Sequence, residues 1–154
     1  MKLTTKGRYA VTALLDLALH QQKGPVTVSE LAQRHGISAA YLERLAGLMR
    51  SKGLLKSIRG AKGGYLLAKE PDAITLAEII DAVDERIDTT RCQGKANCHD
   101  GAMCITHHLW DELNDKISLF FQGITLGALA KKPQIKAHAK STQIPLQFIR
   151  LEHA

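Results

Sequence analysis

The chain has 154 residues and a formal net charge of +6, and 45% of its residues are hydrophobic against 23% charged. This balance excludes a disordered chain, and no apolar run approaches the roughly 18 residues that a membrane-spanning helix needs. The apolar stretch 10–19 is interrupted by Asp16, and no small-residue cleavage site follows it. We therefore expect a cytoplasmic protein without a secretory signal and without a membrane partner.

Positive charge is concentrated in the first half of the chain. Residues 1–69 contain twelve lysines and arginines against three acids, whereas residues 70–115 have a net charge of −8 and residues 116–154 a net charge of +5. A concentrated positive surface attracts polyanions, because each neutralised phosphate releases a counterion. The pattern favours nucleic acid as a partner of the N-terminal part, and a merely solvated basic face is the alternative.

The first third of the chain predicts three helices. Apolar residues recur at helical spacing on two faces of residues 5–20, so this helix is expected to be buried on two sides. Thr27 and Glu30 form a capping box at the start of a second helix, which Gly36 ends in the left-handed conformation. Ser38 caps a third helix that runs to about residue 52. A short helix, a tight turn and a longer helix are typical of a helix-turn-helix, although such pairs also occur in small bundles.

The third helix has a small and polar face opposite its apolar one. With a rotation of about 100° per residue, this face contains Ala40 and Arg44, flanked by Tyr41 and Glu43. Such a face fits a DNA major groove, because arginine pairs with guanine and glutamate accepts from a cytosine amino group while repelling phosphate. Ser38 and the neighbouring amides are expected to bind a phosphate at the helix N-terminus. A solvent-exposed helix of a small bundle is the alternative.

A β-hairpin is predicted directly after the third helix. Residues 54–58 and 65–69 are strand-like, and the turn between them, 59–64, is rich in glycine and basic residues. A hairpin after a recognition helix is the wing of a winged helix-turn-helix, and Arg59 at its tip is expected to enter a minor groove. The glycine spacing fits neither a P-loop nor the dinucleotide fingerprint, which argues against a nucleotide-binding loop.

Residues 75–130 predict one long helix between two short ones. Thr75 and Glu78 form a second capping box that starts a helix to about residue 83, and Thr125 caps a short helix over 126–130. Residues 105–122 form the longest amphipathic helix. A lone helix of this length cannot bury its apolar stripe in so small a domain, so we predict pairing with a second copy, the alternative being an internal core role. The predicted dimerisation residues are Ile105, Leu109, Leu113, Ile117, Phe120 and Phe121.

All three cysteines lie in the window 92–104, in a polar loop that contains two glycines. An odd number of cysteines argues against a disulfide scaffold and favours a metal or cluster site. Gaps of five residues between successive cysteines are wider than zinc knuckles favour, whereas an iron–sulfur cluster is larger because of its bridging sulfides. A cluster is therefore preferred to zinc, and three reduced thiols that lie together by chance are the remaining alternative.

A histidine is expected to complete this ligand set. His107 lies in the first turn of the long helix, three residues after Cys104, so one short arc can present both. His99 would need a tighter chelate with Cys98, and His108 points about 100° further round the helix. The preferred ligands are therefore Cys92, Cys98, Cys104 and His107. The histidines at positions 20, 35, 138 and 153 are expected to be surface or capping residues.

Several motifs together resemble one known family. They are LTTKGRYAV (3–11), IS (37–38), YLE (41–43), SIRG (57–60), GGYLL (63–67), AVDE (82–85), TRCQGK (90–95), CITH (104–107) and ITLG (124–127). This set, which runs from Met1 to about Lys131, resembles the IscR family of iron–sulfur-cluster-sensing winged-helix repressors of bacteria.

The resemblance implies a homodimer that binds double-stranded promoter DNA and holds a [2Fe–2S] cluster, with an iron–sulfur assembly scaffold as the cluster donor. The implied ligands are Cys92, Cys98, Cys104 and His107. The cluster-loaded form of the family represses the genes of cluster assembly, and the cluster-free form binds a second class of promoter sites. Positions 40 and 44 are alanine and arginine here, whereas the family tends to have serine and glutamine, so the operator sequence does not follow from the resemblance.

We thus expect a mainly α fold with a small β-hairpin wing, in three parts. These are a winged helix-turn-helix DNA-binding domain over 1–74 (helix-turn-helix about 28–51), a cluster-binding loop and dimerisation helix over 75–131, and a weakly ordered basic tail over 132–154. The expected function is transcriptional regulation that senses iron–sulfur cluster status. A nitric-oxide- or redox-sensing regulator with a different cluster and an electron-transfer protein are alternatives. An enzyme is not expected, because no nucleophile–base pair is evident.

Overall fold

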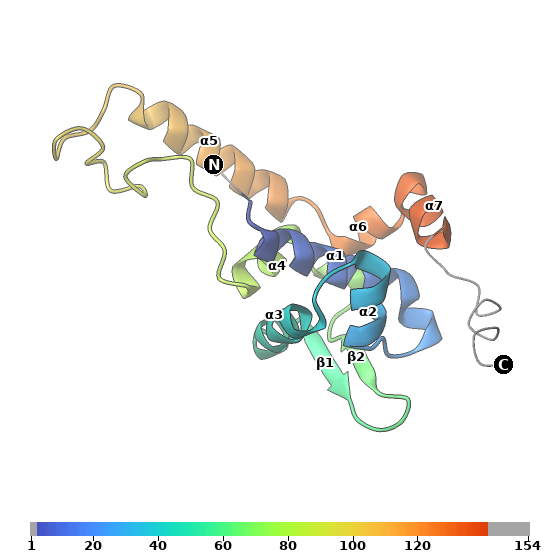
Figure 1. Ribbon diagram of the computed structural model, residues 1–154. Coiled ribbons are helices and arrows are strands. Elements are labelled where there is room, and N and C mark those ends of the chain that lie inside the picture. Colours follow the sequence, from blue (N-terminus) through green and yellow to red (C-terminus); the bar gives the residue numbers. More distant parts are fainter. Residues whose placement is uncertain (1–2, 142–154) are drawn as a thin grey trace.

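The computed structural model describes residues 3–141, and its elements follow in this order: α1 (Thr5–His20), α2 (Val28–His35), α3 (Ala39–Ser51), β1 (Leu55–Ile58), β2 (Gly64–Leu67), α4 (Leu76–Ala82), α5 (His107–Gln122), α6 (Leu126–Ala130) and α7 (Pro133–Ser141), with 3₁₀ turns at Gln21–Lys23 and Pro71–Ala73. The expected mainly α fold with one antiparallel hairpin is confirmed. Helix α5 projects from the body of the molecule, and the cysteine loop lies beyond its far end (Figure 1). None of the described helices is both long and apolar enough to span a bilayer.

Helix α1 is the centre of the hydrophobic core. Ala10 and Leu14 are fully buried and Leu17 is 2% exposed, while Val11 and Leu15 on the second face pack partly buried against the same core. Helices α3, α4, α6 and α7 and strand β2 all contact α1. Because a fully buried leucine contributes about 1.5–3 kcal/mol, this helix with two apolar faces holds the surrounding elements in place.

The N-terminus of α1 is capped from a distant part of the chain. Thr4 makes no side-chain cap, and the first turn contains no acidic residue. Instead the Thr4 N–H donates to the buried carboxylate of Glu85, which follows α4. Gly7 lies against this carboxylate, and a Cβ there would collide with Glu85 Oε2. Because the helix dipole favours a carboxylate at this end, Glu85 fastens α1 to the segment that leads to the cysteines.

The helix-turn-helix forms where its capping residues predict. Thr27 Oγ1 accepts from the Glu30 N–H at 3.2 Å, and Glu30 Oε2 accepts from the Thr27 N–H at 2.7 Å. Gly36 ends α2 with a φ of 62°, a left-handed conformation that favours glycine. Ser38 Oγ then accepts from the Tyr41 N–H at 3.4 Å and starts α3. Both helices are thus fixed at the ends that meet in the turn.

A buried carboxylate joins α1 to α2. Asp16 is 4% exposed, and its two carboxylate oxygens accept from Arg34 Nη2 at 2.7 Å and Arg34 Nε at 2.9 Å. His35 Nε2 lies 2.7 Å from Asp16 Oδ2, and His20 Nδ1 donates to the Asp16 carbonyl at 2.8 Å. His20, expected to be a surface or capping residue, is buried and caps the last turn of α1 through the Asp16 carbonyl. His35, for which the same was expected, is half-buried and binds the Asp16 carboxylate.

We expect Asp16 to make the fold acid-sensitive. Burial alone would raise the pKa of Asp16, but hydrogen bonds from His35 and Arg34 overcome this and lower it to about 2. A folded pKa below the unfolded value stabilises the fold above about pH 4, and that contribution is lost as the pH falls toward 2. Urea unfolding of the parent and of Asp16→Asn should therefore show a stability difference that shrinks by about 2 kcal/mol over this range. A difference that does not change with pH would contradict this role.

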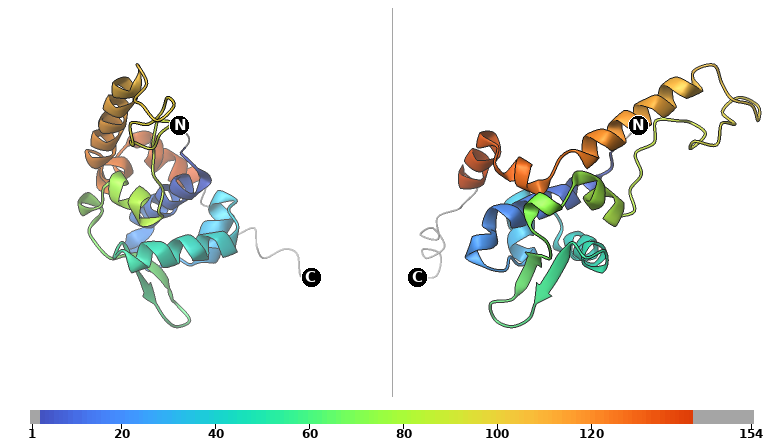
Figure 2. Two further views of the ribbon diagram at one scale, coloured as in Figure 1. Left: turned by 90° about the vertical axis from the view of Figure 1, so that its left-hand side faces the viewer. Right: turned by 180° about the vertical axis from the view of Figure 1, so that it is seen from behind.

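The hairpin is fixed on both edges of β2. Strands β1 and β2 pair antiparallel, with Leu55 opposite Leu67, and both leucines are buried in the core. On the other edge, Tyr65 exchanges two backbone hydrogen bonds with Val26, at 3.0 and 2.8 Å. The turn of the hairpin projects beyond the helices, as the two views of Figure 2 show. The predicted wing is therefore present, and backbone hydrogen bonds on both edges of β2 hold its base.

Two boundaries differ from those expected. Helix α5 begins at His107 rather than at residue 105, because residues 104–106 form a turn in which the His107 N–H donates to the Cys104 carbonyl at 3.1 Å. Ile105 therefore precedes the helix and is fully exposed. Residues 133–141, all of which were expected to be weakly ordered, form α7, whose half-buried Ile135 and Ala139 lie one turn apart and face α1. The expectation for residues 142–154 falls outside the described residues.

Candidate metal centre and nucleic-acid interface

Three of the four predicted ligands converge. Cys92 Sγ lies 3.5 Å from His107 Nδ1, and Cys98 Sγ lies 3.8 Å from the same nitrogen. The ligand atoms of Cys92, Cys98 and His107 all lie within 4.8 Å of one another. Cys92 and His107 are 8% and 6% exposed, so α5 and the preceding loop together shield them from water.

Cys104 lines the same pocket but lies outside this compact group. Its N–H donates to Cys98 Sγ at 3.1 Å, while its own sulfur lies 3.7 Å from Thr106 Oγ1. All three cysteines are free thiols. The pocket has a volume of about 220 Å³, and its lining residues are Thr90, Arg91, Cys92, Cys98, His99, Cys104, Thr106, His107 and Trp110. Three thiols and an imidazole around one small pocket are the donor set of an iron–sulfur cluster or of zinc, so the residues present fit a resident metal group.

The structure separates the candidate histidines. His107, the first residue of α5, directs Nδ1 toward two thiols, whereas its neighbour His108 is exposed and contacts the His107 ring edge to face at 5.8 Å. His99 lines the pocket but is exposed, and its backbone forms a tight turn with Ala102. Of the three, His107 alone joins the compact group found among the described residues.

The loop is wound tightly around the thiols. Gln93, Ala96 and Asp100 have φ values of 54°, 55° and 46°, a left-handed region that non-glycine residues rarely adopt. Strain of this kind persists where surrounding contacts impose it, and it is frequent at functional sites.

The local hydrogen bonds favour thiolate at Cys92. Burial alone would raise the pKa of Cys92, but the backbone amides of Ala96 and Gly94 help to lower it to about 7. The hydrogen bond between Cys98 and Cys104 raises the pKa of Cys98 and lowers that of Cys104. Because the thiolate is the form that binds a metal, this lowered pKa favours Cys92 as a candidate ligand.

The predicted DNA-reading residues lie on the outer face of α3 and at the tip of the hairpin. Glu43 and Arg44 are exposed on α3, as are Ser38 and Ala40 at its start, and Arg59 is exposed on the hairpin turn. Tyr41 is only partly exposed, because its ring packs edge to face on Tyr9 at 5.9 Å. The Tyr65 hydroxyl donates to Glu43 Oε2 at 3.3 Å and so links the hairpin to α3. Tyr65 belongs to the GGYLL motif, but no sequence signal indicated its contact with Glu43.

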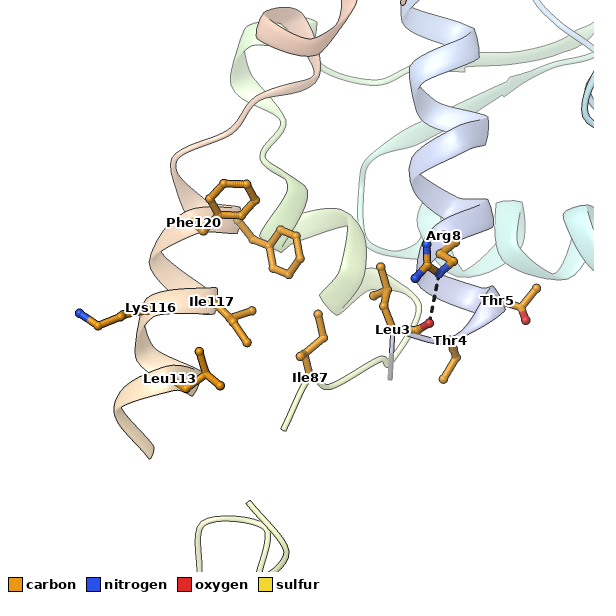
Figure 3. Close-up of a pocket in the computed structure, with 10 residues that line it drawn as sticks. Leu3, Thr4, Thr5, Arg8, Ile87, Leu113, Lys116, Ile117 and Phe120 are labelled. Atoms are coloured by element: carbon orange, nitrogen blue, oxygen red, sulfur yellow. Dashed lines mark hydrogen bonds between the residues drawn. The ribbon is translucent and has the colours of Figure 1, made fainter. Parts of the chain in front are cut away.

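Helix α5 leaves part of its apolar stripe uncovered. Leu109, Leu119 and Phe120 are 57%, 67% and 62% exposed, whereas Leu113, Ile117 and Phe121 are partly buried. Leu119 was not among the predicted dimerisation residues. An apolar groove of about 960 Å³ lies between α5 and the start of α1 (Figure 3). Leu3 and Ile87 line it opposite Leu113 and Ile117, with Arg8 and Lys116 at its edges.

The sequence of the chain is similar to those of known transcriptional regulators. The model of the Rrf2 family, described as an iron-dependent transcriptional regulator, matches residues 3–132. The HTH-type transcriptional regulator IscR of Escherichia coli (strain K12 / DH10B) is 50% identical over 135 residues, which cover 88% of this chain and 83% of that protein.

Solved structures agree with this result. The structure of T. potens IscR has a TM-score of 0.69 and 33% sequence identity, and the match covers 97% of this chain and 96% of that chain. CymR, the global cysteine regulator of B. subtilis, has a TM-score of 0.69 and 35% identity, with 84% and 96% covered.

A winged helix-turn-helix joined to a thiol and imidazole group thus defines a DNA-binding transcriptional regulator. The chain belongs to the Rrf2 family and is a regulator of the IscR type. These relatives are transcriptional regulators and not enzymes, and their similarity implies an iron–sulfur cluster, with which the thiol and imidazole group is compatible.

Proposed function

We propose that the chain binds a [2Fe–2S] cluster through Cys92, Cys98, Cys104 and His107 and regulates cluster-assembly genes as a homodimer, with the loaded form as the repressor. The main support is that two thiols and His107 Nδ1 lie within 4.8 Å in a chain that is 50% identical to E. coli IscR. When bound, such a cluster would be an iron centre that is sensitive to oxidation, and its occupancy would follow the cellular supply of clusters.

The chain's own residues connect this centre to the DNA-binding part. His107 begins α5, which packs on α4, and Glu85 after α4 caps α1. A metal group bound by the loop and by His107 would therefore act on both α5 and the core that holds α3. Coupling between two such sites typically amounts to about 1–3 kcal/mol, which is a 5–150-fold change in affinity.

On the DNA side, Arg44 and Glu43 contact base edges in the major groove, and Ala40 and Tyr41 lie beside them. Ser38 and its neighbouring backbone amides bind a phosphate at the start of α3. Exposure of these residues on one face of α3 supports this assignment, except for the partly packed Tyr41. The contact with Tyr65 holds Glu43 toward the hairpin, which restricts where its negative charge meets the duplex.

Replacing Arg59 with alanine is expected to weaken binding chiefly at sites with a narrow minor groove, where negative potential attracts an arginine. Fluorescence anisotropy on a panel of duplexes with A-tract and mixed flanks would measure this, with Lys56→Ala as a control in the same exposed hairpin. Equal weakening on every duplex would assign Arg59 to a phosphate contact instead.

Two copies of the chain pair through α5 in this proposal. The exposed Leu109 and Phe120 lie on one face of α5, Phe120 lines the groove, and a second α5 can cover this apolar surface. The division into a DNA-binding part over 1–74 and a sensing and dimerising part over 75–131 is part of the same proposal, as are a cytoplasmic location and an assembly scaffold as the cluster donor.

The ligand set is tested by an absorption spectrum with iron and sulfide analysis on anaerobically purified protein. The parent is expected to contain iron and acid-labile sulfide in equal amounts. His107→Ala should lose most of both, whereas the adjacent His108→Ala should retain them. Equal loss in the two histidine variants, or zinc in place of iron in the parent, would refute the assignment.

A further inference from the structure

A hydrogen-bonded group fastens the cysteine loop to α5. Asp88 Oδ1 accepts from the Thr90 N–H at 2.7 Å, the Thr90 hydroxyl at 2.6 Å and the Asn114 side-chain amide at 3.1 Å. Asn114 Oδ1 in turn accepts from the Thr89 N–H at 2.8 Å. We call these four residues, Asp88, Thr89, Thr90 and Asn114, the loop anchor.

The loop anchor continues directly into the ligand loop. Thr90 is 9% exposed, and its Oγ1 accepts from the Gly94 N–H at 2.8 Å, so the threonine closes the turn that contains Cys92. Thr90 and Cys92 also line the same pocket. The Thr90 hydrogen bonds lower the pKa of Asp88, so that the carboxylate, which only accepts, matches its three donors.

Asn114 connects the loop anchor to a distant part of the chain, helix α5. It lies 26 residues after Asp88, on α5, and is separated from His107 by seven positions, which places both on one face of the helix. Thr89 Oγ1 also lies 2.8 Å from the Trp110 carbonyl, one turn before Asn114. One face of α5 therefore holds a ligand at its first residue and the base of the ligand loop two turns later.

We propose that Thr90 and Asn114 are positioning residues for the metal group, since they hold Cys92 beside His107 before any metal binds. This inference rests on the proposed function, because the ligand set is that of the proposed cluster. Without the loop anchor, residues 88–94 keep their sequence link to the thiols but lose their attachment to α5. Partners that orient metal ligands in this way typically change metal affinity by about 10–100-fold when they are removed.

Four variants separate positioning from other effects. Thr90→Val removes the hydroxyl and preserves the shape, and Thr90→Ser restores the hydroxyl. Asn114→Ala removes the side-chain bonds from α5 to Asp88 and Thr89, none of which involves a cysteine, and leaves only the bond from Thr89 Oγ1 to the Trp110 carbonyl. Asp115→Ala is the matched control, because Asp115 is the exposed neighbour of Asn114 on the same helix.

The first measurement uses reduced, metal-free protein and the alkylation rate of each cysteine, followed by peptide mass spectrometry. Cys92 should react several-fold faster in Thr90→Val and Asn114→Ala than in the parent, Thr90→Ser and Asp115→Ala. Unchanged Cys92 reactivity in Asn114→Ala would overturn the proposal. Should that variant fail to fold by circular dichroism, Thr90→Val against Thr90→Ser decides the question in the same assay.

The second measurement uses anaerobic, iron-loaded protein and the rate at which a chelator removes its visible absorption. Thr90→Val and Asn114→Ala should lose absorption about 10-fold faster or more than the parent, and the two controls at the parent rate. Equal rates in all five proteins would also overturn the proposal. A parent protein without iron would refute the proposed function, while the alkylation rates would still test the loop anchor.

Discussion

The Cys92→Ala variant is expected to be colourless and to lose cluster-dependent repression, while it still folds and binds DNA. Cys92 is the most buried of the three thiols and lies beside His107 Nδ1, so its loss removes a proposed ligand that no other residue of the group replaces. The helices that build the core of the DNA-binding part do not depend on it. The 5–150-fold response of operator affinity that coupling of this kind typically gives should therefore vanish.

This result is measured with a promoter–reporter in cells that assemble clusters, together with band shifts of purified protein. Asn97→Ala is the matched control, because Asn97 is an exposed residue of the same loop and should leave repression intact. A Cys92→Ala protein that is folded by circular dichroism but binds no DNA would show that sensing and DNA binding are not separable in this chain.

The Phe120→Asp variant is expected to be monomeric and to lose most of its affinity for a two-half-site operator. Phe120 is 62% exposed and borders the groove between α5 and α1, so a buried charge there would oppose pairing of two chains. Two linked half-site contacts typically bind about 10²–10⁴-fold more tightly than one, and the variant should lose about that factor.

Sedimentation velocity and operator titrations measure the two effects on the same samples. Gln122→Asp adds the same charge on the same helix but outside the groove, and it should remain dimeric with the parent affinity. A Phe120→Asp protein that stays dimeric would place the interface elsewhere and remove the main support for pairing through α5.

Much of the fold was predictable because it depends on short-range rules. The capping pairs at Thr27 and Thr75, the left-handed Gly36 and the serine cap at position 38 all form where residue type and spacing place them. The hairpin follows its strand-like runs and glycine-rich turn. These elements are encoded within a few residues, so periodicity and caps are sufficient to find them.

Long-range partners were not predictable from the same rules. Asp16 interrupts an apolar face, and nothing local indicates that Arg34 and His35 lie close enough to neutralise it. Helix α7 was missed because its apolar pair, Ile135 and Ala139, is short and becomes significant only against α1.

At the candidate centre, spacing indicated which residue types could bind a metal and placed His107 one turn after Cys104. The close approach of His107 to Cys92, 15 residues earlier, depends on how the loop folds back on α5. The same folding brings Asn114 to Asp88. Contacts of this range require the tertiary structure, which is why the sequence indicated candidate ligands but not the residues that support them.

In our proposal, a metal group held by Cys92, Cys98, Cys104 and His107 decides how the chain binds its operator. The most direct test measures, on one anaerobic sample, the iron and sulfide content and the operator affinity before and after the metal is removed by a chelator. We expect equal iron and sulfide at the start and an affinity for the cluster-assembly promoter that falls 5–150-fold on removal. An iron-free sample, or the same affinity before and after removal, would contradict it.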